Sequence, residues 1–236
     1  MSQSSPTDHQ QQQQQHATSP GQSSTNPSSS AELASLKTCL RAALRQFPDF
    51  PSPGILFEDF LPIFINPSLH DDLVRALQLH IQQQQQQPDV IVGLEARGFL
   101  FGPTLALRLG ASFVPARKKG KLPGPCETQG FSKEYGEDFF QMQAGSIKPG
   151  QKVIVVDDVI ATGVYILNVT HPIFAFADFL NTIGGSAYAA GELVKKQGGQ
   201  LLGYIFVLEL DFLKGRAKLT APVYTLLSGQ DGKDRK

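Results

Sequence analysis

The sequence has little cysteine and no net charge, and both shortages narrow the range of functions. Its two cysteines, Cys39 and Cys126, have neither the spacing of a zinc site nor that of a disulfide framework. Five scattered histidines suggest no transition-metal site either. The formal net charge of zero argues against nucleic acid or an anionic membrane as the main partner. We therefore expect a soluble, cytoplasmic protein that binds neither nucleic acid nor membrane.

The first thirty residues lack the apolar side chains that a packed core needs. They are mostly Gln, Ser, Pro and Thr, include the run Gln10–Gln15, and carry one charge, at Asp8. We expect residues 1–30 to be a disordered tail. They show neither the basic start and apolar core of a secretory signal nor the arginines of a transit peptide. Residues 31–229 are then expected to form a single domain, followed by a polar tail at residues 230–236.

Short apolar runs alternate with helical patterns along this domain. Two predicted helices have apolar faces, formed by Leu33, Leu36, Leu40 and Leu44 and by Leu73, Leu77 and Ile81. The runs expected to form strands are Val90–Val92, Ser112–Val114, Val153–Val156, Leu202–Val207 and Val223–Leu227. This alternation predicts an α/β fold with a mainly parallel, twisted sheet flanked by helices.

Charged residues follow three of the predicted strands. In such sheets, ligands bind beyond the carboxyl ends of the strands. The three segments are Gly93–Phe99 with Arg97, Arg117–Gly124 with Arg117, Lys118 and Lys121, and Asp157–Gly163 with Asp157, Asp158, Ala161, Thr162 and Gly163. Two cationic turns and one acidic, glycine-bearing turn are therefore expected to meet at one edge of the sheet.

The chemistry of these turns indicates a ligand with two anionic ends. A small-residue turn that leads into a helix presents backbone N–H groups to a phosphate. Two carboxylates beside it would repel that phosphate unless they bind hydroxyl groups or a metal-bridged group. A ribose with its 5'-phosphate meets both requirements, and the four cations would hold a more highly charged group such as a diphosphate. The pattern predicts a phosphorylated sugar that carries a polyphosphate.

Each feature alone has a simpler explanation. The acidic pair is more often an ordinary strand end, the cluster Arg117–Lys121 a solvated loop, and Arg97 a cap for the end of a helix. Their placement at successive strand ends favours a binding site over these alternatives.

Four segments resemble the signatures of the adenine phosphoribosyltransferases, which have the type I phosphoribosyltransferase fold. The segments are Phe47–Phe57, Glu95–Gly102, Arg117–Gly124 and Val155–Gly163. The resemblance implies a small N-terminal hood and a mobile lid loop over Glu127–Glu137. It also implies purine salvage: adenine and phosphoribosyl diphosphate would give AMP and diphosphate, with Mg²⁺, in a homodimer.

The resemblance further implies roles for individual residues. The ribose and its phosphate would be bound by Asp157, Asp158, Ala161, Thr162, Gly163, Gly185 and Ser186. The diphosphate would be bound by Arg97, Lys118, Lys121 and, from the neighbouring subunit, Arg117. Adenine would lie against Ile55, Leu56 and Phe57, and the lid would bring the catalytic pair Glu134 and Tyr135. Mg²⁺ would be held mainly by oxygens of phosphoribosyl diphosphate and by water.

An insert, Val164–Ile183, separates the two halves of the predicted phosphate loop. The second half, Gly185–Ala187, is expected to begin a helix. It contains no Lys or Arg and a single acid, Asp178. It is a poor membrane span, because it is marginal in length and interrupted by polar residues and Pro172. One interpretation is a genuine lid or partner-binding loop, although an apolar loop of this length is unusual in a compact domain.

The interpretation we favour is a translated intron. Removing Val164–Gly184 joins Gly163 directly to Gly185 and Ser186, which restores the unbroken loop. A GGT codon at Gly163 and an ATA–G junction at Ile183–Gly184 would give GT…AG ends. With the insert retained, we expect weak or no activity, because the loop must feed directly into the helix. The alternatives are a non-catalytic relative that serves as partner subunit or ligand sensor, and a transferase acting on guanine or hypoxanthine.

Overall fold

A computed structural model of the chain describes residues 28–50, 56–133, 136–160, 174–209, 216 and 219–228. Predictions that fall on Ile55, Glu134, Tyr135 and Ala161–Gly163 lie outside these ranges. Across the described ranges, no helix combines the length and the hydropathy needed to cross a membrane.

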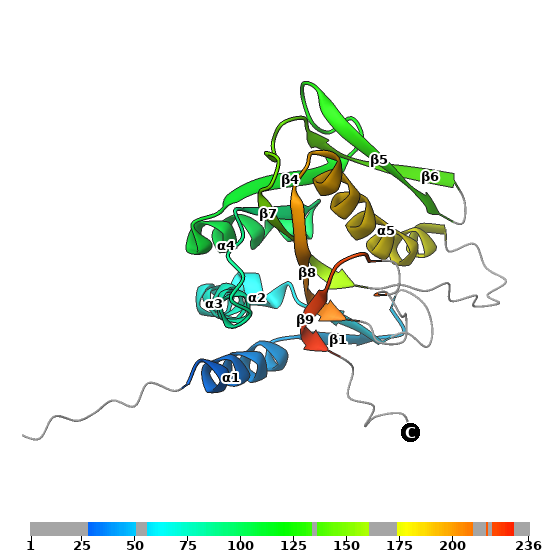
Figure 1. Cartoon of the computed structure of the whole chain (residues 1–236). Helices are drawn as coiled ribbons and strands as arrows, with labels where there is room; N and C mark the ends of the chain where they lie inside the picture. The colour runs from blue at the N-terminus through cyan, green and yellow to red at the C-terminus, as the bar shows by residue number, and fades with distance from the viewer. Residues whose placement is uncertain are drawn as a thin grey trace, which may run out of the picture.

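A seven-stranded sheet forms the centre of the molecule, in the order β5-β6-β4-β3-β7-β8-β9 (Figure 1). The five strands from β4 to β9 run parallel, and β6 joins β4 in the antiparallel sense. The strands are β3 (Val90–Leu94), β4 (Ser112–Lys118), β5 (Cys126–Lys133), β6 (Gly136–Gln143), β7 (Lys152–Ile160), β8 (Gln200–Glu209) and β9 (Val223–Ser228). The predicted mainly parallel α/β sheet is confirmed, and each of the five predicted strands is present.

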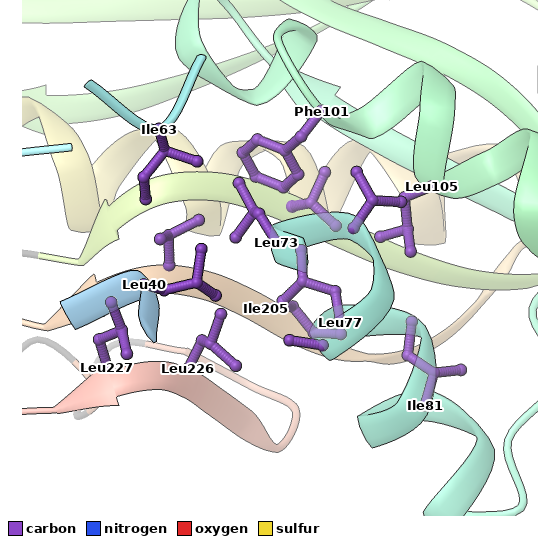
Figure 2. Packing of buried hydrophobic residues seen from close by; sticks show 14 of the residues in the cluster. Leu40, Ile63, Leu73, Leu77, Ile81, Phe101, Leu105, Ile205, Leu226 and Leu227 are labelled. Atoms are coloured by element: carbon purple, nitrogen blue, oxygen red, sulfur yellow. The ribbon is translucent and has the colours of Figure 1, made fainter. Parts of the chain in front are cut away.

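Helices cover both faces of this sheet. The helical elements are α1 (Ser29–Ala42), α2 (Pro62–Ile65), α3 (Pro67–Gln83), η1 (Arg97–Phe99), α4 (Gly102–Leu109) and α5 (Phe174–Lys196). Helices α1 to α4 pack on one face, where Leu40, Leu73 and Leu105 meet strand residues such as Ile205 (Figure 2). Helix α5 packs on the other face with Ala190 and Leu193. Alternate residues of β7 point to the two faces, so the strand is buried from Val153 to Ile160.

Local sequence explains where α3 begins. Asn66 caps the helix, and its side-chain oxygen accepts hydrogen bonds from the N–H groups of Ser68 at 2.9 Å and Leu69 at 3.4 Å. Pro67 occupies the first turn, where its fixed φ fits the helix and its missing N–H costs nothing. The buried residues Leu73, Leu77 and Ile81 then recur at helical spacing and define the face that packs on the sheet.

The N-terminal hood contains a second, two-stranded sheet. Strand β1 (Arg45–Pro48) pairs antiparallel with β2 (Leu56–Asp59), so that Phe47 lies opposite Phe57. An ion pair of 2.7 Å between Arg45 and Asp59 joins the two strands. Residues 49–55 connect them. The hood thus places the described part of the predicted adenine-binding edge, Leu56 and Phe57, on a strand of its own.

The predicted lid loop takes a more regular form than expected. Residues 126–143 form the antiparallel hairpin β5–β6, and residues 134–135 connect its strands. Phe131, Phe140 and Met142 of this hairpin are buried, and they share a core with Ala187 and Leu193 of α5. The Nζ of Lys196 also donates a hydrogen bond of 2.8 Å to the carbonyl of Thr128. The sequence does not predict this strand pairing, because the burial of these side chains depends on α5, which is distant in sequence.

Helix α5 begins earlier than the sequence predicts. We expected it to start at Gly185, but it runs without interruption from Phe174 and therefore includes the second half of the insert. Residues 174–183 contain neither proline nor glycine, and they include alanine and leucine, so nothing in their composition stops the helix. The predicted helix start was wrong by about three turns.

A histidine of α3, His80, packs on an aromatic ring away from the carboxyl ends of the strands. The ring of His80 stacks on the ring of Tyr224, with centroids 3.2 Å apart and planes inclined by 7°. The Nζ of Lys37 lies 5.3 Å from the centroid of Tyr224. Burial of the imidazole, followed by the positive charge of Lys37, lowers the pKa of His80 to about 4.

This pKa makes the protein less stable in mild acid. The unfolded chain protonates His80 near its ordinary pKa of 6.5, whereas the folded chain does so only near 4. Stability is therefore lost as the pH falls through this interval. We expect His80→Phe, which keeps the stacked ring, to reduce the fall in Tm between these pH values by about 2–5 °C. Thermal unfolding followed by circular dichroism measures this; parallel curves for the two proteins would contradict it.

Candidate functional site

The three charged segments predicted from the sequence meet at the carboxyl edge of the sheet. Strand β3 lies between β4 and β7, and its residue Leu94 pairs with Ala116 while Gly93 pairs with Val156. The residues that follow these pairs, Glu95, Arg117 and Asp157, are therefore neighbours across the strands. The sequence prediction that the cationic and acidic turns share one edge agrees with this register.

An acidic pair and an arginine form the centre of this edge. Asp157 and Asp158 lie within the buried part of β7, and their exposed fractions are 8% and 1%. The Nε of Arg97 lies 2.7 Å from Oδ2 of Asp158. Arg97 reaches this position because η1 follows β3 directly and packs against β7: a Cβ at Gly98 would lie 2.7 Å from the carbonyl oxygen of Val156. Glycine at position 98 is what allows this close approach.

The surroundings of Asp157 and Asp158 disfavour the state in which both carboxylates are charged. Burial, followed by the charge of Asp158, raises the pKa of Asp157 well above its ordinary value of 3.8. Burial also raises the pKa of Asp158, although the positive charge of Arg97 opposes the shift. The pair therefore retains protons more readily than an exposed pair, and Asp158 is the member that is matched with a cation.

The second cationic turn is held by a carboxylate. An NH2 of Arg117 donates a hydrogen bond of 2.6 Å to Oε1 of Glu95, and the backbone N–H of Lys118 donates one of 3.1 Å to Oε2. The NH1 of Arg117 donates to the carbonyl of Lys121 at 3.0 Å, which closes the turn. The hydrogen bond from Arg117 is the main reason why the pKa of Glu95 is lowered. Glu95 and Ala96 are joined by a cis peptide bond.

The hairpin β5–β6 supports the same turn from the other side. The Nζ of Lys118 lies 3.4 Å from Oδ2 of Asp138, and the N–H of Gly120 donates a 2.9 Å hydrogen bond to Oε1 of Gln141. Gly120 has a φ of +81°, a conformation that favours glycine. The turn that carries Lys118 and Lys121 is therefore fixed to β3 and to the hairpin.

Part of the segment predicted to bind adenine, Leu56 and Phe57, lies within the residues that the structure describes. Leu56 and Phe57 lie half-buried in β2, and the ring of Phe57 meets that of Phe50 edge to face at 5.3 Å. The neighbouring Glu58 is 5% exposed and accepts a 3.1 Å hydrogen bond from Nε2 of Gln46. An aromatic face beside a small two-stranded sheet can stack on a flat ring.

The continuation of the predicted phosphate loop lies inside a helix. Gly185 and Ser186 are interior residues of α5, and Ser186 is 4% exposed. The ring of Phe131 lies against Gly185 and leaves no room for a Cβ there. In a helix interior each N–H bonds to the carbonyl four residues earlier. The backbone N–H groups of Gly185 and Ser186 are therefore engaged within α5 rather than placed at the start of a helix.

Two site residues have no role in the sequence prediction. Glu95 lies in a segment that resembles a family signature, but the resemblance implies no function for it, and no sequence pattern marks Asp138. Their partners, Arg117 and Lys118, are distant in sequence, so only the register of β3 with β4 and of β4 with β6 brings them together. An acid directly after a predicted strand was the only signal for Glu95.

A metal would have to be held largely by a ligand at this edge. Among the described residues, no group of three His, Cys, Asp or Glu side chains is arranged to hold an ion. Asp157 and Asp158 offer oxygen atoms, the donors that Mg²⁺ prefers, but Asp158 is engaged by Arg97. The side chains fit an ion that arrives bound to phosphate oxygens.

The known proteins reported below, which are similar to this chain in sequence or structure, are named for the same activity. The phosphoribosyl transferase domain family matches residues 63–174, a range that ends within the insert. The adenine phosphoribosyltransferase of Debaryomyces hansenii is 55% identical over 202 residues, which cover 86% of this chain and 96% of that protein.

Solved structures agree with this relationship. That of adenine phosphoribosyltransferase from Saccharomyces cerevisiae, in complex with adenine and an imino-altritol bisphosphate, is 54% identical, with a TM-score of 0.70 and coverage of 82% of this chain and 99% of that one. The enzyme from Rhodothermus marinus is 38% identical, with a TM-score of 0.67 and coverage of 83% and 99%. By its sequence and its fold, the chain belongs to the adenine phosphoribosyltransferase family.

Proposed function

We propose that this chain carries out the reaction for which its family is named. It transfers the 5-phosphoribosyl group from phosphoribosyl diphosphate to adenine, which gives AMP and diphosphate and salvages a free purine. The observation that carries the proposal is the meeting of Arg97, Arg117 and Lys118 with the acidic pair Asp157-Asp158 at one sheet edge. The relative from Debaryomyces hansenii and the adenine-bound structure from Saccharomyces cerevisiae support the choice of substrates.

The residues of this edge suit the two ends of the sugar. Asp157 and Asp158 would accept hydrogen bonds from the ribose hydroxyls. Arg97, Arg117, Lys118 and Lys121 would bind the diphosphate, with Arg117 reaching the site of the neighbouring subunit in a homodimer. Displacement at the anomeric carbon builds positive charge on the ribose and negative charge on the departing diphosphate. Fixed cations at the departing group would therefore supply the largest part of the rate enhancement.

Mg²⁺ would enter with phosphoribosyl diphosphate and bind mainly to its oxygens. When bound, it would neutralise part of the diphosphate charge. Adenine would stack on Phe57 in the hood, beside Ile55 and Leu56. Glu134 and Tyr135, at the connection of the β5–β6 hairpin, would manage the purine proton and exclude water. We place the enzyme in the cytoplasm.

The 5'-phosphate would bind to Ala161, Thr162 and Gly163, continued by Gly185 and Ser186. This part of the proposal requires a chain in which Gly163 precedes Gly185 directly. We therefore propose that Val164–Ile183 is a translated intron and that the working enzyme lacks it. The early start of α5 favours a second candidate for the chain as written, a catalytically impaired relative that acts as partner subunit or ligand sensor.

A competition assay between bases tests the proposed function. We expect the form lacking Val164–Gly184 to convert adenine to AMP with a kcat/KM at least about 100-fold above the values for guanine and hypoxanthine. Both competitors carry an oxygen where adenine carries an amine, and a site that hydrogen-bonds one group rejects the other. Product nucleotides are separated by ion-exchange chromatography. Equal use of the three bases would contradict the choice of adenine, and no nucleotide from any base would contradict the transferase.

A further inference from the structure

Glu95 has the contacts of an internal anion bound in a cationic turn. Its two oxygens accept hydrogen bonds from the guanidinium of Arg117 at 2.6 Å and from the backbone N–H of Lys118 at 3.1 Å. A guanidinium beside a backbone amide is also a donor set that suits a phosphate oxygen. The same two donors therefore serve a carboxylate in this structure and suit an anionic ligand equally well.

Two other cations at this edge are also paired with acids. Arg97 lies 2.7 Å from Asp158, and Lys118 lies 3.4 Å from Asp138. Of the three ion pairs, only that of Glu95 joins an acid to both a side chain and a main-chain donor of the predicted diphosphate turn. The pKa of Glu95 is lowered, mainly by Arg117, so its carboxylate is charged at neutral pH.

We propose that the carboxylate of Glu95 competes with diphosphate for Arg117 and the Lys118 amide. The proposal rests on the proposed function, because it takes diphosphate as the ligand of this turn, and in the homodimer Arg117 meets the diphosphate bound at the neighbouring subunit's site. Binding of diphosphate displaces Glu95 from the two donors, and departure of diphosphate allows Glu95 to return. Glu95 is therefore a positioning residue that holds the turn in shape and limits the affinity for diphosphate, the product that must leave.

The remaining nitrogen atoms of Arg117 indicate that its NH2 can exchange one acceptor for another. Within the described part of the chain, the Nε of Arg117 is buried and has no hydrogen-bond partner, while its NH1 holds the carbonyl of Lys121 at 3.0 Å. Arg117 thus stays anchored to its own turn through NH1 when NH2 changes from one acceptor to another. Exchange then needs a rotation of the Glu95 side chain and no unfolding of the turn.

Titration calorimetry on the full chain tests the proposal. It measures the binding of inorganic diphosphate in the presence of Mg²⁺. The substitution is Glu95→Gln, which removes the charge and keeps an oxygen that can accept from the Lys118 amide. We expect the Kd for diphosphate to fall about two- to fivefold, the range for loss of one partly exposed competing ion pair. Damage to the turn would instead raise the Kd, so the sign of the change separates competition from a merely structural role.

Glu32→Gln is the matched control. Glu32 forms an ion pair with Arg75 between α1 and α3, at 2.8 Å, and the side-chain exposures of 31% and 38% resemble the 22% and 32% of Glu95 and Arg117. The substitution Glu32→Gln also removes one negative charge, but at a position away from the sheet edge. It is expected to leave the Kd for diphosphate unchanged. Unchanged or weaker binding by Glu95→Gln, with normal binding by the parent chain, overturns the competition and leaves the proposed function standing. Absence of binding by the parent chain overturns the competition, and absence of binding by the form lacking Val164–Gly184 as well overturns diphosphate as the ligand of this turn and with it the proposed function.

Discussion

Removal of Val164–Gly184 is expected to raise the rate of AMP formation at least about 100-fold. In the full chain the amides of Gly185 and Ser186 lie inside α5, where helical hydrogen bonding engages them. The deletion makes Gly185 the start of the helix, so the first N–H groups are released to bind a phosphate. A displacement of about 1 Å in a catalytic group can cost a hundredfold, and here the helix start moves by three turns. Steady-state kinetics with adenine and phosphoribosyl diphosphate measures the gain.

Deletion of residues 1–27 provides a control of similar length. This segment precedes α1 and is expected to leave the rate of either form unchanged. Equal activity of the full chain and the form lacking Val164–Gly184 would sink the idea that the insert disables the loop. Sequencing of the transcript gives an independent answer, because the intron interpretation requires spliced messages that join Gly163 to Gly185.

Asp157→Asn is expected to raise stability and to remove most of the activity. Asp157 is buried next to a second carboxylate, and both conditions raise its pKa. The folded chain therefore keeps a proton that the unfolded chain loses near pH 3.8, and stability falls as the pH rises above that value. The amide removes this penalty, so Tm should increase by about 2–8 °C at pH 7 and less at pH 4. In the form lacking Val164–Gly184, kcat/KM should fall about 10- to 100-fold with loss of a charged hydrogen bond to ribose.

Asp158→Asn tests whether the change in Tm is specific to Asp157 or follows from neutralising either aspartate. Asp158 is matched with Arg97 at 2.7 Å, so its neutralisation leaves a partly buried guanidinium without its charged partner. Burial raises the pKa of Asp158 as well, but Arg97 opposes that shift, so we expect Asp158→Asn to raise Tm by less than Asp157→Asn while it also lowers activity. A larger increase for Asp157→Asn would support the assignment of charges. A lower Tm for both variants would show that Asp157 is held by contacts that the amide cannot replace.

Sequence pattern predicts the parts of this molecule that depend on nearby residues. The run Val153–Val156 identifies β7, and the acids that follow it mark the carboxyl edge, because strand and turn chemistry are local. The start of α5 was mispredicted because Gly185 looks like a helix start only if the preceding twenty residues are ignored. Residues 174–183 have enough helix-forming side chains to continue the helix across the glycines.

Contacts between distant segments explain the rest of what the sequence does not reveal. The hairpin β5–β6 has many polar residues, and its strands become evident only where Phe131 and Phe140 pack beside α5. The pairing of Glu95 with Arg117 depends on the register of β3 and β4. The two-stranded hood sheet is short, and it includes Pro48, a residue that argues against a strand. Such features follow from tertiary packing, which a single sequence does not display.

The position of β7 in the sheet has a consequence for synthesis on the ribosome. Its neighbour β3 is made first, but its other neighbour, β8, follows only after residues 161–199. During that interval β7, which is buried from Val153 to Ile160, has one open edge that can pair with other chains. Residues 164–183 lengthen the interval by about 1–4 s at ~5–20 residues per second. Retention of the insert would therefore increase aggregation of the nascent protein, in addition to its effect on the phosphate loop.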